Sequence, residues 1–138
     1  MTVGTDLRVE LVTPLGAIAN LETDAVTAPG ELGEFEIFAG HVPFLTQLHA
    51  GVLTLGETRT KQHFAVGPGF LEVTADGLIR ILVERAVASD EVDKALAKDE
   101  LKDAEPKLDA WKGDLGAEYK TLKAAHDWAV AQIEAAGR

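Results

Sequence analysis

The sequence predicts an all-β domain, a sandwich or barrel, followed by an antiparallel hairpin of two α-helices. Short apolar segments separated by glycine and proline turns occupy residues 1–88, which is typical of all-β folds. After Ala88 alanine, lysine, glutamate and leucine dominate, as helices require. Two apolar repeats of helical period follow, joined by a glycine-containing segment. We therefore assign residues 1–88 to the β domain and residues 89–138 to the helical hairpin.

The β domain begins with LRVEL (residues 7–11), whose alternation of apolar and charged residues predicts a half-buried strand. A Pro-Leu-Gly turn at residues 14–16 and a Pro29-Gly30 turn bracket the apolar segment 18–26. Further strands are predicted at residues 52–55, 63–66, 70–74 and 78–83. The Asp76-Gly77 pair between the last two indicates a tight turn, because glycine tolerates positive φ.

The helical hairpin is predicted to begin at Ser89, a residue type that caps helices, with Asp90 and Glu91 in the first turn. Pro106 is expected to kink or end the first helix near Glu105, because proline lacks an N–H donor and its ring clashes with the preceding turn. The apolar residues of each helix share one face: Ala97, Leu101, Ala104, Leu108 and Trp111 in the first, and Tyr119, Leu122, His126, Ala129 and Ile133 in the second.

An isolated helical hairpin cannot bury both of its apolar faces, so it is expected to pack on the β domain or on a partner. The second helix is rich in alanine. Alanine permits close approach but supplies little apolar area to an interface. The sequence therefore predicts docking that is weak enough to be reversible.

Composition excludes several classes of function. The chain has 13 basic and 23 acidic residues, a formal charge of −10, and no basic face that would neutralise nucleic acid or an anionic membrane. The absence of cysteine excludes disulfides and thiolate metal sites. The first residues do not resemble a secretory signal, and no apolar run approaches the ~18 residues of a membrane span. We expect neither nucleic acid binding nor direct membrane insertion.

The sequence contains no recognisable motif for catalysis. The glycine spacing of residues 51–58 resembles a phosphate loop, but Glu57 stands where lysine is needed. None of the four histidines has the spacing of a metal ligand, and Ser89 is the only serine. Glu31, Glu34 and Glu36 fall in a predicted flexible loop, where carboxylates without calcium-loop spacing are typical of a solvated acidic edge. The sequence thus predicts no active site, no metal and no cofactor.

GEFEIFAGHVPFLT (residues 33–46) resembles the G-x-x-G-x-x-P-G-H-A-P-L-L signature of the ε subunit of F-type ATP synthases. Residues 7–18, LRVELVTPLGAI, resemble the first strand pair of that family, and residues 67–86 resemble the end of its sandwich. The segment 90–138 matches the family's helical hairpin in length and position. Two residues depart from the signature, since Glu36 and Ala39 stand where the family has glycine and proline.

The resemblance implies a sandwich of about ten short strands followed by the helical hairpin, and a rotor role without catalysis. In the family the sandwich binds the γ subunit and sits on the ring of c subunits, which links the membrane sector to the catalytic α/β head. The resemblance also implies a peripheral position on the cytoplasmic face of a bacterial inner membrane, with a processed organellar member as the alternative. The residues expected at the junction with γ and the c ring are Glu31, Glu34, Phe38, His41 and Pro43.

Some members of the family bind ATP through an I/L-D-x-x-R-A motif at the start of the first helix. The matching residues here are Val92, Asp93, Leu96 and Ala97, with Leu96 in place of the arginine. Because the guanidinium that would pair with phosphate is missing, no tight ATP binding is expected.

The family's helical hairpin can also extend along γ and inhibit ATP hydrolysis, using basic residues against an acidic segment of the catalytic subunit. Here residues 113–138 offer only Lys120, Lys123 and Arg138 against four acidic residues. The sequence therefore does not decide whether this hairpin inhibits ATP hydrolysis. The alternative function is a free-standing ligand-binding β-sandwich with the helical hairpin as a dimerisation arm. Such a module calls for a groove of surface aromatics, yet both tryptophans fall in the helical region.

Overall fold

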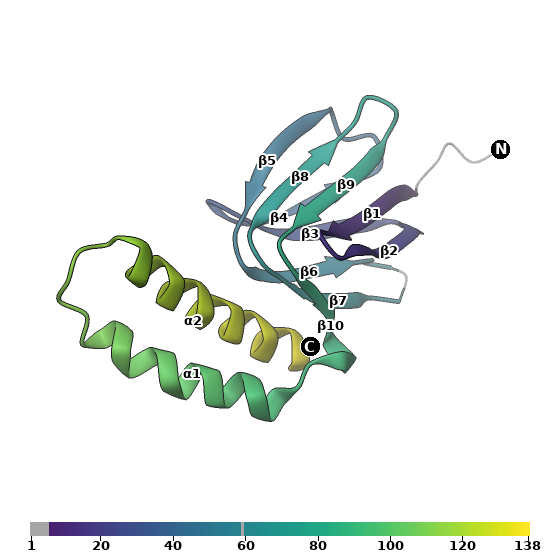
Figure 1. The fold of residues 1–138 in the computed structure, drawn as a ribbon. Helices are drawn as coiled ribbons and strands as arrows, with labels where there is room; N and C mark the ends of the chain where they lie inside the picture. The colour runs from purple at the N-terminus through teal and green to yellow at the C-terminus, as the bar shows by residue number, and fades with distance from the viewer. Residues whose placement is uncertain (1–5, 59) are drawn as a thin grey trace.

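The computed structural model describes residues 6–58 and 60–138. It confirms the predicted fold class, because a ten-stranded β-sandwich precedes two antiparallel α-helices (Figure 1). The strands are β1 (Leu7–Thr13), β2 (Gly16–Thr23), β3 (Ala25–Gly30), β4 (Gly33–Phe38), β5 (Phe44–Leu48), β6 (Gly51–Leu55), β7 (Gln62–Val66), β8 (Gly69–Val73), β9 (Leu78–Val83) and β10 (Ala86–Ala88). The helical elements are the 3-10 turn η1 (Ser89–Glu91) and the helices α1 (Lys94–Asp109) and α2 (Ala117–Ala136).

The strands form one continuous sheet that folds back on itself. Its order is β10-β7-β6-β3-β5-β8-β9-β1-β2, with β4 paired to β3. β1 and β9 are parallel, and the other described pairs are antiparallel. β3 pairs with β6 at Val26 and Thr27 but with β5 only at Gly30, so the sheet bends there. The result is a sandwich close to a closed barrel (Figure 1).

The core lies inside the sandwich and follows the predicted period of two. In β1, Leu7, Val9 and Leu11 are buried, whereas Arg8 is exposed. β9 alternates in the same way, with Arg80 on the outer face. Burial of each large aliphatic side chain contributes about 1.5–3 kcal/mol. The largest fully buried side chains are Leu11, Ile37, Leu48, Leu53, Leu55, Leu71, Ile79 and Ile81.

Residues 30–46 are not the flexible loop that the sequence pattern predicts. They contain β4 and the start of β5, and each of the six residues of β4 pairs with β3. Backbone pairing with β3 overrides the low β-propensity of glycine and glutamate in this segment. Glu34 and Glu36 therefore lie on the exposed face of a strand. The predicted segment 18–26 is likewise divided between β2 and β3 at Asp24.

The prediction that the first helix begins at Ser89 is wrong. Residues 89–91 form a 3-10 turn without a side-chain cap, and Val92 is extended (φ −68°, ψ 130°), which separates this turn from α1. The N-cap of α1 is Asp93, whose Oδ1 accepts a hydrogen bond from the Leu96 N–H at 3.0 Å. An aspartate cap supplies both the acceptor and the negative charge that the helix dipole favours.

Pro106 does not end α1 near Glu105, because the helix continues to Asp109. The backbone N–H of Ala110 donates to the Pro106 carbonyl at 3.0 Å, so the last turn is complete. Pro106 has no N–H, so α1 lacks one backbone hydrogen bond at this position. Because Pro106 lies in the last turn of α1, only a few residues of the helix follow the missing bond.

The helical hairpin lies on the β-sandwich through α2, one of the two placements expected from the sequence. α2 runs between α1 and the sheet and contacts β6 and β7 (Figure 1). We call this contact the hairpin seat. It consists of the buried residues Val52, Ala65, Ala131 and Ala135, with Val87 and Trp128 packed against them. The seat is small because two of its four buried residues come from alanines of α2.

Candidate functional site

The first candidate surface is the tip of the β3–β4 hairpin. Gly30 and Gly33 pair across the turn, and Gly33 has φ +117°, which favours glycine. The two turn residues, Glu31 and Leu32, project into solvent, and the Leu32 side chain is fully exposed. With Glu34 at the start of β4, the tip presents an aliphatic side chain between two carboxylates.

The second candidate surface is the turn between β4 and β5. Phe38, His41 and Pro43 are all exposed there. The ring of His41 donates from Nδ1 to the carbonyl of Val42 at 2.8 Å, and its centre lies 4.8 Å from that of Phe44. His41 therefore holds the shape of its own turn, and the rest of its ring remains accessible to a partner.

The five residues predicted at the junction with γ and the c ring fall into two groups. Glu31 and Glu34 lie at one end of β4, and Phe38, His41 and Pro43 lie at the other. A strand of six residues separates such groups by about 17 Å. A separation of this size is readily covered by the surface of another protein.

A third surface, which the sequence analysis did not identify, lies on the outward face of β8, β9 and β1. Phe70 is directly opposite Leu82, and Leu82 is opposite Val12, so the three form one row across the sheet. We call it the apolar row. Phe70 and Leu82 are 52% and 48% exposed, although neighbouring residues of the same strands are fully buried. Leu45 on β5 is a further exposed aliphatic side chain of this sheet, at 66%.

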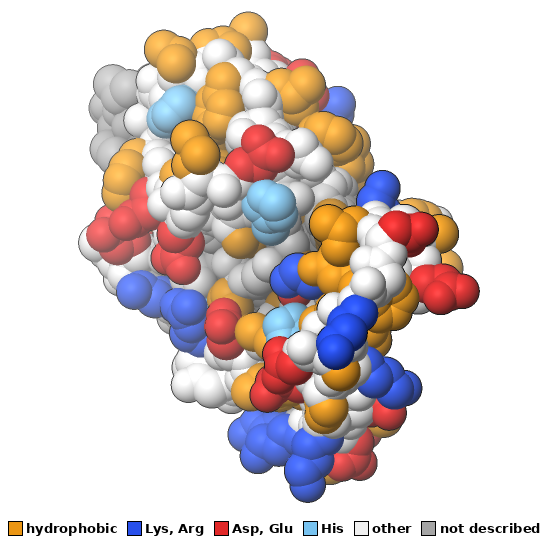
Figure 2. Space-filling model, turned by 90° about the vertical axis from the view of Figure 1, so that its left-hand side faces the viewer, with side chains coloured by type: hydrophobic (Ala, Val, Ile, Leu, Met, Phe, Trp, Pro, Cys, Tyr) orange, Lys and Arg blue, Asp and Glu red, His pale blue; other side chains and the backbone are white. Residues whose placement is uncertain are grey.

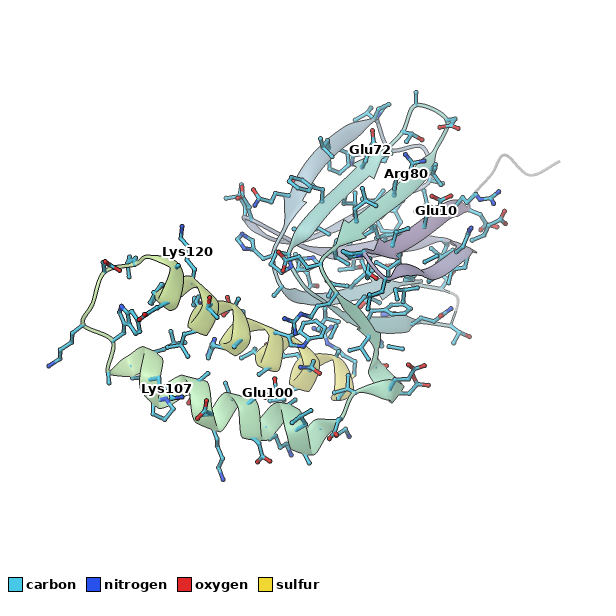
Figure 3. The ribbon with its side chains drawn as sticks, in the orientation of Figure 1. Glu10, Glu72, Arg80, Glu100, Lys107 and Lys120 are labelled. Atoms are coloured by element: carbon cyan, nitrogen blue, oxygen red, sulfur yellow. The ribbon has the colours of Figure 1, made fainter. Side chains whose placement is uncertain are left out.

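A charged row runs beside the apolar row, one pleat away. Arg80 of β9 lies between Glu72 of β8 and Glu10 of β1 (Figure 3). The Arg80 Nε atom is 3.6 Å from Glu10 Oε2. Opposite charges on neighbouring strands stabilise the sheet modestly. They also give this face an apolar strip bordered by paired charges.

A groove of about 550 Å³ runs along the apolar row, and all three residues of the row line it. Its lining includes Pro14, Gln47, Pro68, Phe70 and Leu82. Gly69 forms its floor at a close approach of β8 and β9, since a Cβ there would lie 2.0 Å from the Leu82 carbonyl oxygen.

The alternation of β8 and β9 contained the signal for the apolar row. In FLEV (residues 70–73) the buried residues are Leu71 and Val73, so Phe70 shares the outer face with Glu72. In LIRILV (residues 78–83) Leu82 shares the outer face with Arg80 in the same way. A single apolar residue at an outward position is common, but several that adjoin on neighbouring strands form a patch that is typical of an interaction surface.

Charged side chains border the hairpin seat. The Arg85 guanidinium carbon lies 4.9 Å from the centre of the Trp128 ring. At the end of α2, Arg138 Nη2 lies 4.0 Å from Glu34 Oε2 on β4. On the face drawn in Figure 2, basic, acidic and hydrophobic side chains are interspersed along the hairpin.

The pKa of His63 on β7 is lowered by its surroundings near the end of α2. Its Nδ1 is hydrogen-bonded to the Thr54 hydroxyl at 2.9 Å. Burial lowers the pKa of His63 from 6.5, and the positive charges of Arg138 and Lys61 lower it further. His63 is therefore neutral at physiological pH, and it adds no positive charge beside Arg138.

The residues of the degenerate ATP motif lie at the start of α1. Asp93 is engaged as the N-cap of α1, and Leu96, where the family has arginine, is 54% exposed. Val92 is half-buried and Ala97 is buried. Within the two described segments, no cluster of three His, Asp or Glu side chains has the arrangement of a metal site. No helix of those segments is long and apolar enough to cross a membrane.

The model of the β-sandwich domain of the ATP synthase delta/epsilon chain matches residues 6–89. The chain belongs to the ATP synthase delta/epsilon chain family. The ATP synthase epsilon chain of Geobacter metallireducens is 41% identical over 132 residues, which cover 96% of this chain and 94% of the relative. That of Geobacter sulfurreducens is 39% identical over the same shares. The resemblance seen in the sequence is confirmed, and a free-standing ligand-binding sandwich is not favoured.

Chains from two solved ATP synthase structures have the same fold. A chain of the Euglena gracilis mitochondrial ATP synthase, from a structure of OSCP, F1 and the c-ring, superposes with a TM-score of 0.81 at 23% identity and covers 100% of this chain and 85% of its own. A chain from the central stalk and c-ring of the Tetrahymena thermophila mitochondrial ATP synthase gives 0.64 at 20% identity, covering 94% and 96%. At these identities the likeness concerns the fold.

Proposed function

We propose that this epsilon-family chain is a rotor subunit of an F-type ATP synthase whose β-sandwich binds the γ subunit and the c-subunit ring. It contributes contacts that couple proton-driven rotation to the catalytic α/β head, and no catalytic group. The near-full-length identity of 41% to an epsilon chain carries this proposal. Protein contacts alone hold the subunit at the cytoplasmic face of the membrane.

The apolar row is the surface best suited to γ. Aromatic and aliphatic side chains in a fully covered centre, with polar groups at the rim, are typical of stable protein interfaces. Phe70 and Leu82 supply such a centre, and the Arg80–Glu10 pair supplies part of the rim. The two ends of β4, with Glu31 and Glu34 at one and Phe38, His41 and Pro43 at the other, provide the contacts that reach γ and the c ring.

The binding proposal is tested with Phe70→Ser and Leu82→Ser in the full chain, by titration against the isolated γ subunit. Because both side chains are exposed, the variants should fold normally. Loss of two central apolar contacts should weaken binding at least tenfold, which corresponds to about 1.4 kcal/mol. Leu96→Gln is the matched control, since Leu96 is equally exposed but lies on α1. Undiminished binding of γ by the folded double variant would contradict this assignment of the interface.

The helical hairpin is proposed to be regulatory, and its small seat supports reversible release from the sandwich. The decisive comparison is ATP hydrolysis by the cognate catalytic head reconstituted with the full chain or with a chain ending at Ala88. A marked rise on truncation would establish inhibition by the hairpin. Unchanged hydrolysis, with the truncated sandwich still bound to γ, would mean that the subunit couples rotation without inhibiting hydrolysis.

A further inference from the structure

The hairpin seat has little apolar area with which to hold α2. Its buried residues on the helix are Ala131 and Ala135, and those on the sheet are Val52 and Ala65. Since apolar stabilisation scales with buried area, four side chains of this size make docking depend on the partly buried residues at the rim of the seat, Val87 and Trp128. The contact at that rim is between Arg85 and Trp128.

We propose that Arg85 and Trp128 form a clamp that sets how often the helical hairpin leaves the β-sandwich. Arg85 follows β9, so it belongs to the sandwich, whereas Trp128 belongs to α2. The guanidinium carbon lies 4.9 Å from the ring centre, within the ~6 Å range in which a cation is attracted to an aromatic face. Trp128 is half-buried against the seat, which shields one side of the pair from water.

Gly67 holds the backbone of Arg85 and leaves space for its side chain. Its backbone N–H donates to the Arg85 carbonyl at 2.9 Å, which fixes the backbone of Arg85. A Cβ at Gly67 would lie 3.2 Å from Arg85 Cγ, so the arginine stem occupies space that a side chain would otherwise fill. Because the backbone of Arg85 is held by this hydrogen bond and its stem has room beside Gly67, less conformational entropy is lost when the guanidinium settles over Trp128.

The charged contact just beyond the C-terminal end of α2 is weaker. Arg138 and Glu34 are 4.0 Å apart, and their side chains are 42% and 56% exposed. Exposed pairs of this kind contribute little, because water and salt screen them. The clamp acts within one chain, so its role stands or falls independently of the proposed binding to γ.

Hydrogen–deuterium exchange of the full chain tests the clamp. In Arg85→Gln, the α2 amides should exchange between about threefold and thirtyfold faster than in the wild type, the range expected for loss of a partly shielded cation–π pair. Amides of β8 and β9 should keep their rates, because the sandwich core does not include Arg85. Arg80→Gln is the matched control, since Arg80 is also exposed but contacts Glu10 rather than the hairpin.

Two further variants separate the clamp from a general effect of charge. Arg85→Lys keeps a cation and should retain part of the α2 protection. Gly67→Ala keeps Arg85 but displaces its stem, so α2 should exchange faster without any change of charge. In a Trp111→Phe background, Trp128 is the only tryptophan, and its fluorescence reports its exposure. Quenching by acrylamide should rise from the wild type to Arg85→Lys and again to Arg85→Gln. The clamp is refuted if α2 rates in Arg85→Gln stay within twofold of the wild type, or if β8 and β9 accelerate equally.

Discussion

Glu34 and Arg138 join strand β4 to the last residue of the chain, with Oε2 and Nη2 4.0 Å apart. Glu34 belongs to the surface proposed to meet γ and the c ring, and Arg138 follows the C-terminal end of α2. The docked hairpin therefore ends beside the proposed interface. Because both side chains are exposed, the ion pair contributes little to the stability of the docked hairpin. It shows only that the end of the hairpin lies close to β4.

Phe70 and Leu71 are neighbours in β8 whose side chains lie on opposite faces of the sheet. Substitution of Leu71 should therefore affect stability, and substitution of Phe70 should affect binding. Leu71→Ala removes a fully buried side chain and should lower the free energy of unfolding by about 2–5 kcal/mol. Phe70→Ala should change it by less than about 1 kcal/mol and act on γ binding instead. Urea denaturation of both variants measures the difference. Equal destabilisation would show that Phe70 is a core residue and not an interface residue.

Gly69 and Gly67 predict a second contrast. A Cβ at Gly69 would lie 2.0 Å from the Leu82 carbonyl oxygen and 2.7 Å from the Val83 Cα, which are backbone atoms. Gly69→Ala should therefore cost at least about 1–3 kcal/mol of stability, as overpacking does. Gly67→Ala meets the flexible stem of Arg85 and should cost less. Thermal unfolding of the two variants compares them, and a smaller loss in Gly69→Ala would be inconsistent with the close approach of β8 and β9.

Asp24 holds Glu57 and Thr58, which follow β6, through its carboxylate. Oδ1 accepts the Glu57 N–H at 2.9 Å, Oδ2 accepts the Thr58 N–H at 2.9 Å, and the Thr58 hydroxyl also donates to Oδ2. These bonds, with that of the Thr58 hydroxyl first, lower the pKa of Asp24 from 3.8 to about 2.

A carboxyl group with a lowered pKa in the folded state stabilises the protein above its unfolded pKa, and this contribution is lost as pH falls through the folded value. Asp24→Asn should therefore lower the Tm at pH 7, and its difference from the wild type should shrink between about pH 4 and pH 2. Melting curves of both proteins across this range provide the measurement. A Tm difference that persists unchanged to pH 2 would count against the role of the ionised carboxylate.

Ala131 predicts how tightly α2 fits its seat. Its side chain is 1% exposed, so Ala131→Leu adds three carbon atoms where no space is available. The larger side chain should destabilise the docked position of the hairpin by about 1–3 kcal/mol. The helical hairpin should then undock while the sandwich stays folded. Small-angle X-ray scattering should report a larger radius of gyration. Ala124→Leu, at an exposed position of the same helix, should not change it.

ATP should not bind tightly to this chain. The phosphate-pairing arginine of the family motif is Leu96 here, and Asp93 is engaged in capping α1. Residues 90–112 also carry eight acidic residues against five lysines, which repel a nucleotide triphosphate. Titration calorimetry should detect no binding at micromolar concentrations. A micromolar dissociation constant would overturn this prediction.

Strict alternation made the core predictable from the sequence, as residues 7–11 and 78–83 illustrate. The strands missed were β4, β5 and β10, whose existence depends on pairing with β3, β8 and β7 rather than on local propensity. The helix start was misplaced because Ser89 and Asp93 are both suitable caps, and the extended backbone of Val92 selects the second. Local preference cannot choose between two caps without that tertiary context.

The proposed contact residues were predictable only in part. Family resemblance identified the two ends of β4, but their separation along a strand follows from the ladder with β3. The apolar row depends on the register between β8, β9 and β1, which brings Phe70, Leu82 and Val12 together. Register between strands distant in sequence is set by the whole sheet, and one chain's pattern of residues does not contain it.

The most direct test of the central claim is titration of the γ subunit with the full chain and with a chain ending at Ala88. The main core cluster contains only residues of the sandwich, so the shorter chain should fold by itself. If the sandwich is the γ-binding unit, both chains should bind γ with similar affinity. Failure of the folded, truncated chain to bind γ would contradict the account, because it would place the essential contacts in the helical hairpin.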